Sequence, residues 1–321
     1  MLLYVSSLLA GLILLVWSAD RMVVGAAVIA RNLGITPMVI GLTVVGFATS
    51  APEILVAATA AIRDASTLAL GNAFGSNIAN IGLVVGIAAI IHPLTVKSEA
   101  LSRELPAMVA VSLIPVILLI DLTLSRLDGV ILLIAFLGFI YWVVKLGKRS
   151  SGHDSMEAEY ATEIPEGVTQ RVAILWITIG LLLLLAGANS LVWGAQNIAR
   201  EIGVSDLVIG VTVVAIGTSL PELAVSIVAA RKGLHGLALG NIIGSNAFNM
   251  LAVIGVAGVI RPATLDLAAV QLHLPVLLGF TVAFFFIAYN SNGTMRVGRL
   301  EGAALLVSFI IYQGYIALQN L

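Results

Sequence analysis

The sequence predicts an all-α polytopic membrane protein, and three observations support this fold class. Of the 321 residues, 60% are hydrophobic and only 10% are charged, and the mean hydropathy is +1.10. Soluble proteins carry about 25% charged residues, so lipid is the expected solvent. Hydropathy divides the chain into about ten apolar stretches, each near the 20 or so residues that a helix needs to cross a bilayer. Two long matching segments, described below, divide these stretches into two sets of five.

Helices are the expected spanning elements because every backbone polar group in the hydrocarbon core must be satisfied within its own segment. The expected spans are 2–30, 38–61, 68–91, 105–121, 127–146, 172–199, 207–230, 237–260, 269–289 and 300–318. The first span is apolar from its second residue and lacks a basic leader and a convincing cleavage site, so it is not expected to be a signal peptide. The polar stretch 147–170 is expected to be a linker.

The two halves of the chain contain the same segment. Residues 41–53 read GLTVVGFATSAPE and 210–222 read GVTVVAIGTSLPE, while 71–80 read GNAFGSNIAN and 240–249 read GNIIGSNAFN. Both pairs are offset by 169 residues (210 − 41 and 240 − 71), and the alignment has about 29 identities in the 63 positions from Arg31 and Arg200 onward. The sequence therefore predicts a first five-helix repeat in 1–146, the linker in 147–170 and a second five-helix repeat in 171–321.

An odd number of spans per repeat places the second repeat in the membrane upside down. Inverted-topology repeats are typical of secondary transporters, whose sites lie near the bilayer midplane at the repeat interface. Basic residues near span ends predict the orientation, because they concentrate on the cytoplasmic side. Eleven fall on one side: Arg31, Lys97, Arg103, Lys145, Lys148, Arg149, Arg171, Arg231, Lys232, Arg296 and Arg299. Four fall on the other: Arg63, Arg126, Arg200 and Arg261. We therefore expect a multi-pass protein of the cell (inner) membrane with both termini outside and a cytoplasmic linker.

The composition also narrows the chemistry. The sequence has no cysteine, which excludes disulfides, zinc–thiolate sites and thiol catalysis. Its four histidines are scattered, so a metal would be bound by oxygen. The helices show no nucleophile–base pair or metal cluster, so we expect no enzyme and no cofactor. A net charge of −1 gives no indication of a nucleic-acid partner. The expected partners are ions and the lipid bilayer, and the protein is expected to be a monomer.

Two carboxylates mark the candidate site. Glu53 and Glu222 lie near the middle of apolar spans. An ionised carboxylate there costs about 2.5–3.5 kcal/mol or more, so such residues usually face a polar cavity and mark an ion pathway. Hydroxyl residues precede each carboxylate: Thr49 and Ser50 before Glu53, and Thr218 and Ser219 before Glu222. Residues four apart share a helix face, although such hydroxyls can instead bond back to the preceding turn.

Neighbouring residues extend both copies of this motif. Pro52 and Pro221 free the carbonyls of Ala48 and Gly217, and a kink at each proline would open the backbone to a cavity, although prolines can also kink a helix only for packing. The next span of each repeat adds a hydroxyl and an amide four residues apart: Ser76 with Asn80 and Ser245 with Asn249. These groups, and Asn77 with Asn246, can alternatively link helices.

The combined oxygen set suits a hard cation. Ca²⁺ takes six to eight oxygen ligands in flexible geometry, and two carboxylates balance one Ca²⁺ or about two monovalent ions. Away from this set, Asp20 and Arg21 are expected to form an ion pair at the inner end of a tilted first helix.

The segments GFATSAPE…GNAFGSNIAN and AIGTSLPE…GNIIGSNAFN resemble the two α-repeats of sodium/calcium exchangers, in the calcium/cation antiporter superfamily, and the chain is similar to the compact prokaryotic type. The resemblance implies a ten-helix inverted-repeat fold whose first and sixth helices slide across a core of helices two, three, seven and eight. It implies transported Ca²⁺ and Na⁺ with side-chain ligands at Thr49, Ser50, Glu53, Ser76, Thr218, Ser219, Glu222 and Ser245. It also implies carbonyl ligands at Gly46 and Ala215 beside the sodium sites, with Asn80 and Asn249 in the remaining positions.

The sequence departs from this family pattern at Asn249, where many exchangers have Asp, and at Ala48, which replaces the glycine of the usual GTS triplet. The acidic residues of the potassium-dependent branch and the GNxxE-type repeats of the proton-coupled branch are not found. We therefore expect a secondary active antiporter that exchanges sodium for calcium by alternating access. A calcium/proton or other divalent-cation antiporter, and a non-transporting membrane ion sensor, remain the alternatives.

Overall fold

The computed structural model describes residues 1–97, 101–150, 167–203, 213, 215–265, 267–288 and 294–319. Its first half contains α1 (Leu2–Leu33), α2 (Pro37–Ile40), the π-helical η1 (Gly41–Val45), α3 (Gly46–Ile62), α4 (Ser66–Ala79), the π-helical η2 (Asn80–Val85), α5 (Gly86–Ile91), β1 (Leu94–Lys97), α6 (Leu101–Leu118), the 3-10 turn η3 (Leu119–Asp121), β2 (Thr123–Leu124) and α7 (Arg126–Ser150). Its second half contains α9 (Gln170–Glu201), α11 (Ala215–Thr218), α12 (Leu220–Arg231), α13 (His235–Ala247), the π-helical η5 (Phe248–Val253), α14 (Ile254–Ile260), β3 (Ala263–Thr264), α15 (Leu267–Ala288), β4 (Thr294–Val297) and α16 (Arg299–Gln319).

Eight helical stretches among the described residues are long and apolar enough to cross a membrane: Leu2–Leu33, Pro37–Ile62, Ser66–Ile91, Arg126–Lys145, Gln170–Glu201, His235–Ile260, Val270–Ala288 and Arg299–Leu318. They confirm the prediction of an all-α polytopic membrane protein. The predicted span 105–121 falls on a shorter apolar helix, Pro106–Asp121. The predicted span 207–230 lies partly outside the described residues, and its described part is interrupted at Ser219. Most of the predicted linker 147–170 also lies outside the described residues.

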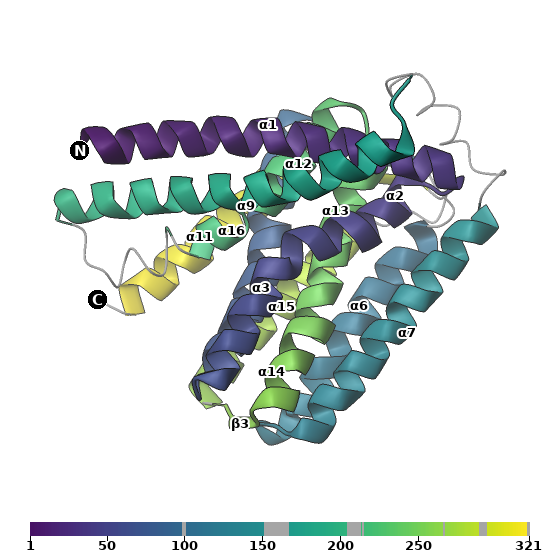
Figure 1. Cartoon of the computed structure of the whole chain (residues 1–321). Coiled ribbons are helices and arrows are strands. Elements are labelled where there is room, and N and C mark those ends of the chain that lie inside the picture. Colours follow the sequence, from purple (N-terminus) through teal and green to yellow (C-terminus); the bar gives the residue numbers. More distant parts are fainter. Residues whose placement is uncertain are drawn as a thin grey trace.

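The two longest helices, α1 and α9, run antiparallel and lie across the other helices (Figure 1). Glycines allow α1 and α9 to approach each other closely. A Cβ added to Gly187 would lie 2.8 Å from the backbone N of Leu15 and 3.0 Å from the carbonyl O of Gly11. A Cβ added to Gly25 would lie 2.7 Å from the carbonyl O of Ala173. The interface is therefore a contact of backbone against backbone, which requires small residues, as in other closely packed membrane helices.

The contacts between α1 and α9 occur in exchanged pairs. Gly11 and Gly180 are counterparts under the 169-residue offset, and so are Ser18 and Gly187. Gly11 packs against Gly187, and Ser18 packs against Gly180, whose added Cβ would lie 3.1 Å from the Ser18 carbonyl O. Each contact therefore maps onto the other when the two halves of the chain are exchanged.

The short strands also join the two halves of the chain. They form two antiparallel pairs, β1 with β4 and β2 with β3. Leu94 is opposite Val297 in one pair, and Ala263 is opposite Leu124 in the other. Leu94 and Ala263 are counterparts under the 169-residue offset (263 − 94). Each strand pair thus links one half of the chain to the other.

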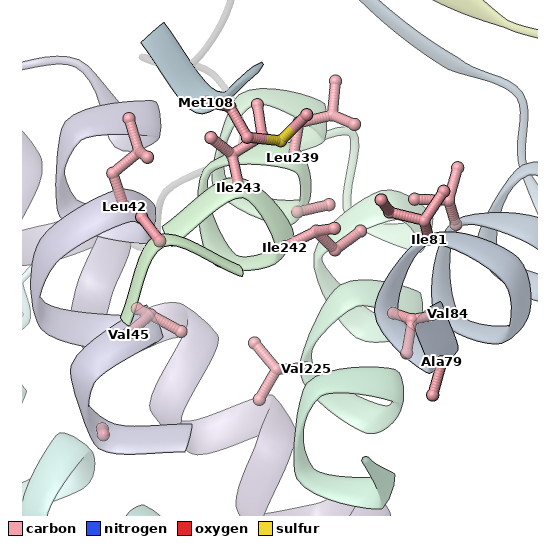
Figure 2. Packing of buried hydrophobic residues seen from close by; sticks show 14 of the residues in the cluster. Leu42, Val45, Ala79, Ile81, Val84, Met108, Val225, Leu239, Ile242 and Ile243 are labelled. Carbon is pink, nitrogen blue, oxygen red and sulfur yellow. The ribbon is translucent and has the colours of Figure 1, made fainter. Parts of the chain in front are cut away.

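A buried apolar cluster joins the central helices (Figure 2). It contains Leu42 and Val45 from η1, Ile81 and Val84 from η2, Met108 from α6, Val225 from α12, and Leu239, Ile242 and Ile243 from α13. Glycines again permit the close approach, since a Cβ on Gly240 would strike the carbonyl O of Met38 and one on Gly244 would strike the carbonyl O of Leu42. The middle and the carboxy-terminal part of α13 therefore pack directly against the backbone of α2 and η1.

The expected ion pair between Asp20 and Arg21 is wrong. The Asp20 carboxylate instead pairs with Lys232 Nζ at 2.8 Å, which links α1 to the end of α12. The Arg21 guanidinium lies over two indole rings, 5.7 Å from the centroid of Trp17 and 5.2 Å from that of Trp176. Adjacent residues on a helix point in directions about 100° apart, so Asp20 and Arg21 meet different neighbours.

Candidate ion-binding site

The first wall of the site is the inner face of α3. Thr49 and Ser50 are 0% exposed and Glu53 is 2% exposed, so these polar side chains are removed from lipid and from bulk water. Thr49 and Glu53 lie one above the other because they are four residues apart in a continuous helix. The sequence prediction that they share a face is confirmed by this geometry.

The repeated sequence predicts the same kink at Pro52 and at Pro221, but the backbone differs at the two prolines. Pro52 lies inside the continuous helix α3. In the second copy, α11 ends at Thr218 and α12 begins at Leu220, so Ser219 interrupts the helix, with φ −93° and ψ 4°. Pro221 then occupies the first turn of α12, where a missing N–H leaves no bond unmade. The break also places Glu222 in the first turn of α12, 1% exposed.

The second wall comes from α4 with η2 and from α13 with η5. Ser76, Asn80, Ser245 and Asn249 are all at most 4% exposed. The π-helical turn η2 begins at Asn80, and the π-helical turn η5 contains Asn249. Such wide turns are rare and frequently occur at functional sites, because they reorient side chains and loosen the regular ladder of backbone hydrogen bonds.

Side chains from both halves of the chain meet at this point. Thr49 Oγ1 and Ser245 Oγ lie 3.2 Å apart, within hydrogen-bond distance. Both hydroxyls lie near the Glu222 carboxylate without a hydrogen bond to it, and the Glu222 and Glu53 carboxylates are near enough to act on each other as like charges. The two acidic residues predicted from separate repeats therefore belong to one buried site.

The asparagines next to the site link its helices. Asn77 Nδ2 donates to the carbonyl O of Asn246 at 3.2 Å, and Asn80 Nδ2 donates to Asn246 Oδ1 at 3.1 Å. Asn77 and Asn246 therefore join α4 to α13, which favours the helix-linking interpretation for this pair. The side-chain nitrogen of Asn80 takes part in that link, whereas its side-chain oxygen Oδ1 has no partner among the described residues and is available to an ion.

Many oxygens in the site lack a hydrogen-bond partner among the described residues. They are Ser50 Oγ, Glu53 Oε2, Ser76 Oγ, Asn77 Oδ1, Asn80 Oδ1, Ser219 Oγ, Asn249 Oδ1 and both carboxylate oxygens of Glu222. Buried polar groups are normally paired, so such a concentration needs an explanation. A hard cation supplies one, because oxygens in this number and charge are the ligands of Ca²⁺ and Na⁺. Among the described residues, no three His, Cys, Asp or Glu side chains lie close enough together to hold a metal ion. Such a cation would therefore be coordinated by two carboxylates and by neutral oxygens.

The remaining predicted ligands are Gly46, Thr218 and Ala215. The Gly46 carbonyl O accepts a long hydrogen bond from Thr49 Oγ1 at 3.4 Å, so it lies beside the hydroxyl cluster. Thr218 is partly buried at the end of α11. Ala215 begins that short helix, and its side chain lies outside the described residues.

Sequence reasoning missed Asn241 and Ser226. Both are 0% exposed, and Asn241 contacts Thr49, Ser226 and the backbone of Glu222. A signal was present, since Asn241 and its counterpart Asn72 both follow the first glycine of the repeated GN…GSN segment. Ser226 has no such signal, because its counterpart is Ala57.

Similar proteins extend over nearly the whole chain. CaxA of Alkalimonas amylolytica is 47% identical over 95% of this chain and 96% of its own length. The inner membrane protein YrbG of Escherichia coli is 40% identical over 97% of this chain and 96% of its own length. The sodium/calcium exchanger MaX1 of Methanosarcina acetivorans is 30% identical over 95% of this chain and 96% of its own length.

The fold is also that of a solved exchanger. A structure of the sodium-calcium exchanger NCX_Mj soaked with Na⁺ and Ca²⁺ matches with a TM-score of 0.82 and 35% identity, covering 97% of both chains. The family model described as sodium/calcium exchanger protein matches residues 3–145 and 172–318. These matches cover most of the chain and include both halves of the buried site, and they show that the chain belongs to the sodium/calcium exchanger family.

Proposed function

We propose that the protein is a secondary active antiporter that exchanges sodium for calcium across the membrane. The observation that carries this proposal is the meeting of two buried carboxylates, Glu53 and Glu222, with unpartnered oxygens around them. The proposed ion ligands are Thr49, Ser50, Glu53, Ser76, Asn80, Thr218, Ser219, Glu222, Ser245 and Asn249, with the carbonyls of Gly46 and Ala215. Two negative charges match one Ca²⁺, and the same oxygens accept Na⁺ after calcium leaves.

We infer that the chain is built as two inverted five-helix repeats of ten spans in all, residues 1–146 and 171–321, joined by the linker 147–170. The exchanged contacts Gly11–Gly187 and Ser18–Gly180 support a two-fold axis in the membrane plane. The family match supports the boundaries, since it leaves 146–171 unmatched.

Alternating access is supported by an asymmetry between counterparts. Gly240 and Asn241 are buried against η1, whereas their counterparts Gly71 and Asn72 are exposed and half-buried, respectively. Gly71 lies near the start of α4, at the end that the charge bias places outside. This arrangement fits a carrier that is sealed toward the cytoplasm and open toward the outside. Exchange of the two packings would reverse the opening, as in other inverted-repeat transporters.

The proposed location is the inner membrane, with both termini outside and the linker in the cytoplasm, and the proposed active unit is a monomer. A calcium/proton antiporter is the second candidate. This second candidate is supported by Asn249, which is an amide where many exchangers have a carboxylate. The site therefore has one negative charge fewer with which to bind the ions that drive transport. The names of CaxA and YrbG state no coupling ion.

The test is calcium-45 uptake into proteoliposomes that contain the purified protein. Sodium, potassium and proton gradients are imposed one at a time, and protein-free vesicles are the control. We expect uptake that requires an outward sodium gradient. Uptake driven by a proton gradient alone would replace this proposal with calcium/proton exchange. Calcium binding without flux would support a sensor.

A further inference from the structure

We propose that Asn241 is a positioning residue that turns the lone pairs of Thr49 Oγ1 toward the transported cation. This inference rests on the proposed ion-binding function. Asn241 lies in α13, is 0% exposed, and is not among the expected ion ligands. Its side chain touches both copies of the carboxylate motif, since Thr49 belongs to the first copy and Glu222 to the second.

The hydrogen bonds fix which way the amide points. Asn241 Nδ2 lies 3.4 Å from the backbone carbonyl O of Glu222 and 3.1 Å from Ser226 Oγ. A carbonyl oxygen can only accept, so this end of the amide must be the nitrogen with its two N–H donors. The other end, Oδ1, therefore faces Thr49 Oγ1 at 3.1 Å.

This orientation decides where the Thr49 proton goes. An amide oxygen can only accept, so the Thr49 hydroxyl must be the donor in that bond. Two other acceptors are farther from Thr49 Oγ1: Ser245 Oγ at 3.2 Å and the Gly46 carbonyl O at 3.4 Å. A hydroxyl that coordinates a cation must present lone pairs and direct its proton elsewhere. With its proton held by Asn241, Thr49 Oγ1 keeps two lone pairs, one available to the Ser245 hydroxyl 3.2 Å away and one available to a cation.

The counterpart residue cannot make the same set of bonds. Asn72 is half-buried, and its Nδ2 has no hydrogen-bond partner among the described residues. The position equivalent to Ser226 is Ala57, which has no hydroxyl to accept an N–H. In any exchanged conformation, Asn72 would therefore lack one of the three partners that orient Asn241. The structure thus assigns the preorganised hydroxyl ligand to Thr49, on one side of the proposed two-fold axis.

The proposal is tested by a double-mutant cycle on calcium-45 flux in proteoliposomes. Asn241→Leu keeps a similar volume but removes the acceptor of the Thr49 proton. We expect it to raise the KM for calcium about five- to thirty-fold, the effect of one buried oriented hydrogen bond, with a smaller change in kcat. Thr49→Val should raise the KM similarly, and the double variant should be no worse than Thr49→Val alone. Residues that act through one interaction show this non-additivity.

Two further variants test the same positioning role. Ser226→Ala removes one acceptor of the Asn241 amide without touching the ions, and should shift the calcium KM in the same direction by a smaller factor. Asn72→Leu should shift it less than Asn241→Leu. Fold changes that multiply in the double variant, or an unchanged calcium KM in both Asn241→Leu and Ser226→Ala, would overturn the positioning role. Loss of calcium flux in the wild type would instead overturn the proposed function.

Discussion

Asn77 and Asn246 are counterparts under the 169-residue offset, and they touch each other: Asn77 Nδ2 donates to the carbonyl O of Asn246 at 3.2 Å. In an object with two-fold symmetry, a residue meets its own counterpart only near the axis. The pair therefore marks the axis of the proposed inverted repeat, between α4 and α13. Ser76 and Ser245, the preceding residues, then lie on opposite sides of the proposed ion site.

Removing either buried carboxylate should abolish transport. In Glu53→Gln and Glu222→Gln, one negative charge no longer compensates the divalent ion in a buried site. An uncompensated buried charge costs about 3–5 kcal/mol, so calcium flux should fall at least about 100-fold. Glu301→Gln, at an exposed position in α16, is the matched control and should transport normally. Near-normal calcium uptake by either site variant, purified and folded, would remove these residues from the proposed site.

A methyl group in the seam between α1 and α9 should slow transport. Ala at position 187 would place its Cβ 2.8 Å from the backbone N of Leu15, so the two helices would have to separate. Overpacking of this kind costs about 1–3 kcal/mol, and we expect turnover to fall about five-fold or more in Gly187→Ala with little change in the calcium KM. Gly314→Ala, where an added Cβ meets nothing within 4 Å, is the control. Equal turnover in both variants would argue against a moving contact at this seam.

The amide at position 249 should affect the pH response. Asn249→Asp adds a titratable group to a site that already holds two carboxylates, while Asn is permanently neutral. We expect the variant to retain sodium-driven calcium exchange and to become more sensitive to pH between about 6 and 8, as expected of interacting carboxyl groups. The measurement is flux against pH in proteoliposomes. Superimposable profiles for wild type and variant would show that this position does not couple to the ions.

The orientation can be tested by cysteine labelling, since the sequence contains no cysteine. We expect a cysteine at Ser155 in the linker to react with membrane-impermeant thiol reagents only from the cytoplasmic side. Thr264→Cys, at an exposed position in β3, is the matched outside control and should react in intact cells. Reaction of Ser155→Cys in intact cells would invert the proposed topology.

The sequence predicted the parts of the fold and site that depend on periodicity and repetition. The offset of 169 residues paired Glu53 with Glu222, and spacing along the helix put Thr49 on the face of Glu53. Contacts between residues far apart in the sequence, and local breaks that depend on them, were not predictable in this way. The partner of Asp20 is Lys232, more than 200 residues away, and no local pattern indicates it. The break at Ser219 also depends on context, because the equivalent Ser50 lies inside a continuous helix.

The contact between Asp20 and Lys232 has a consequence for the energy balance of the transport cycle. Its counterparts are Asn189 and Arg63, which cannot form an ion pair because Asn189 carries no charge. Each side chain of the Asp20–Lys232 pair is 37% exposed, and exposed pairs contribute about 0.2–1 kcal/mol. That is enough to change relative populations by up to about five-fold. In the proposed transport cycle, two related but unequal halves would give two end states of different free energy, so the empty carrier would favour one side of the membrane before any gradient acts on it.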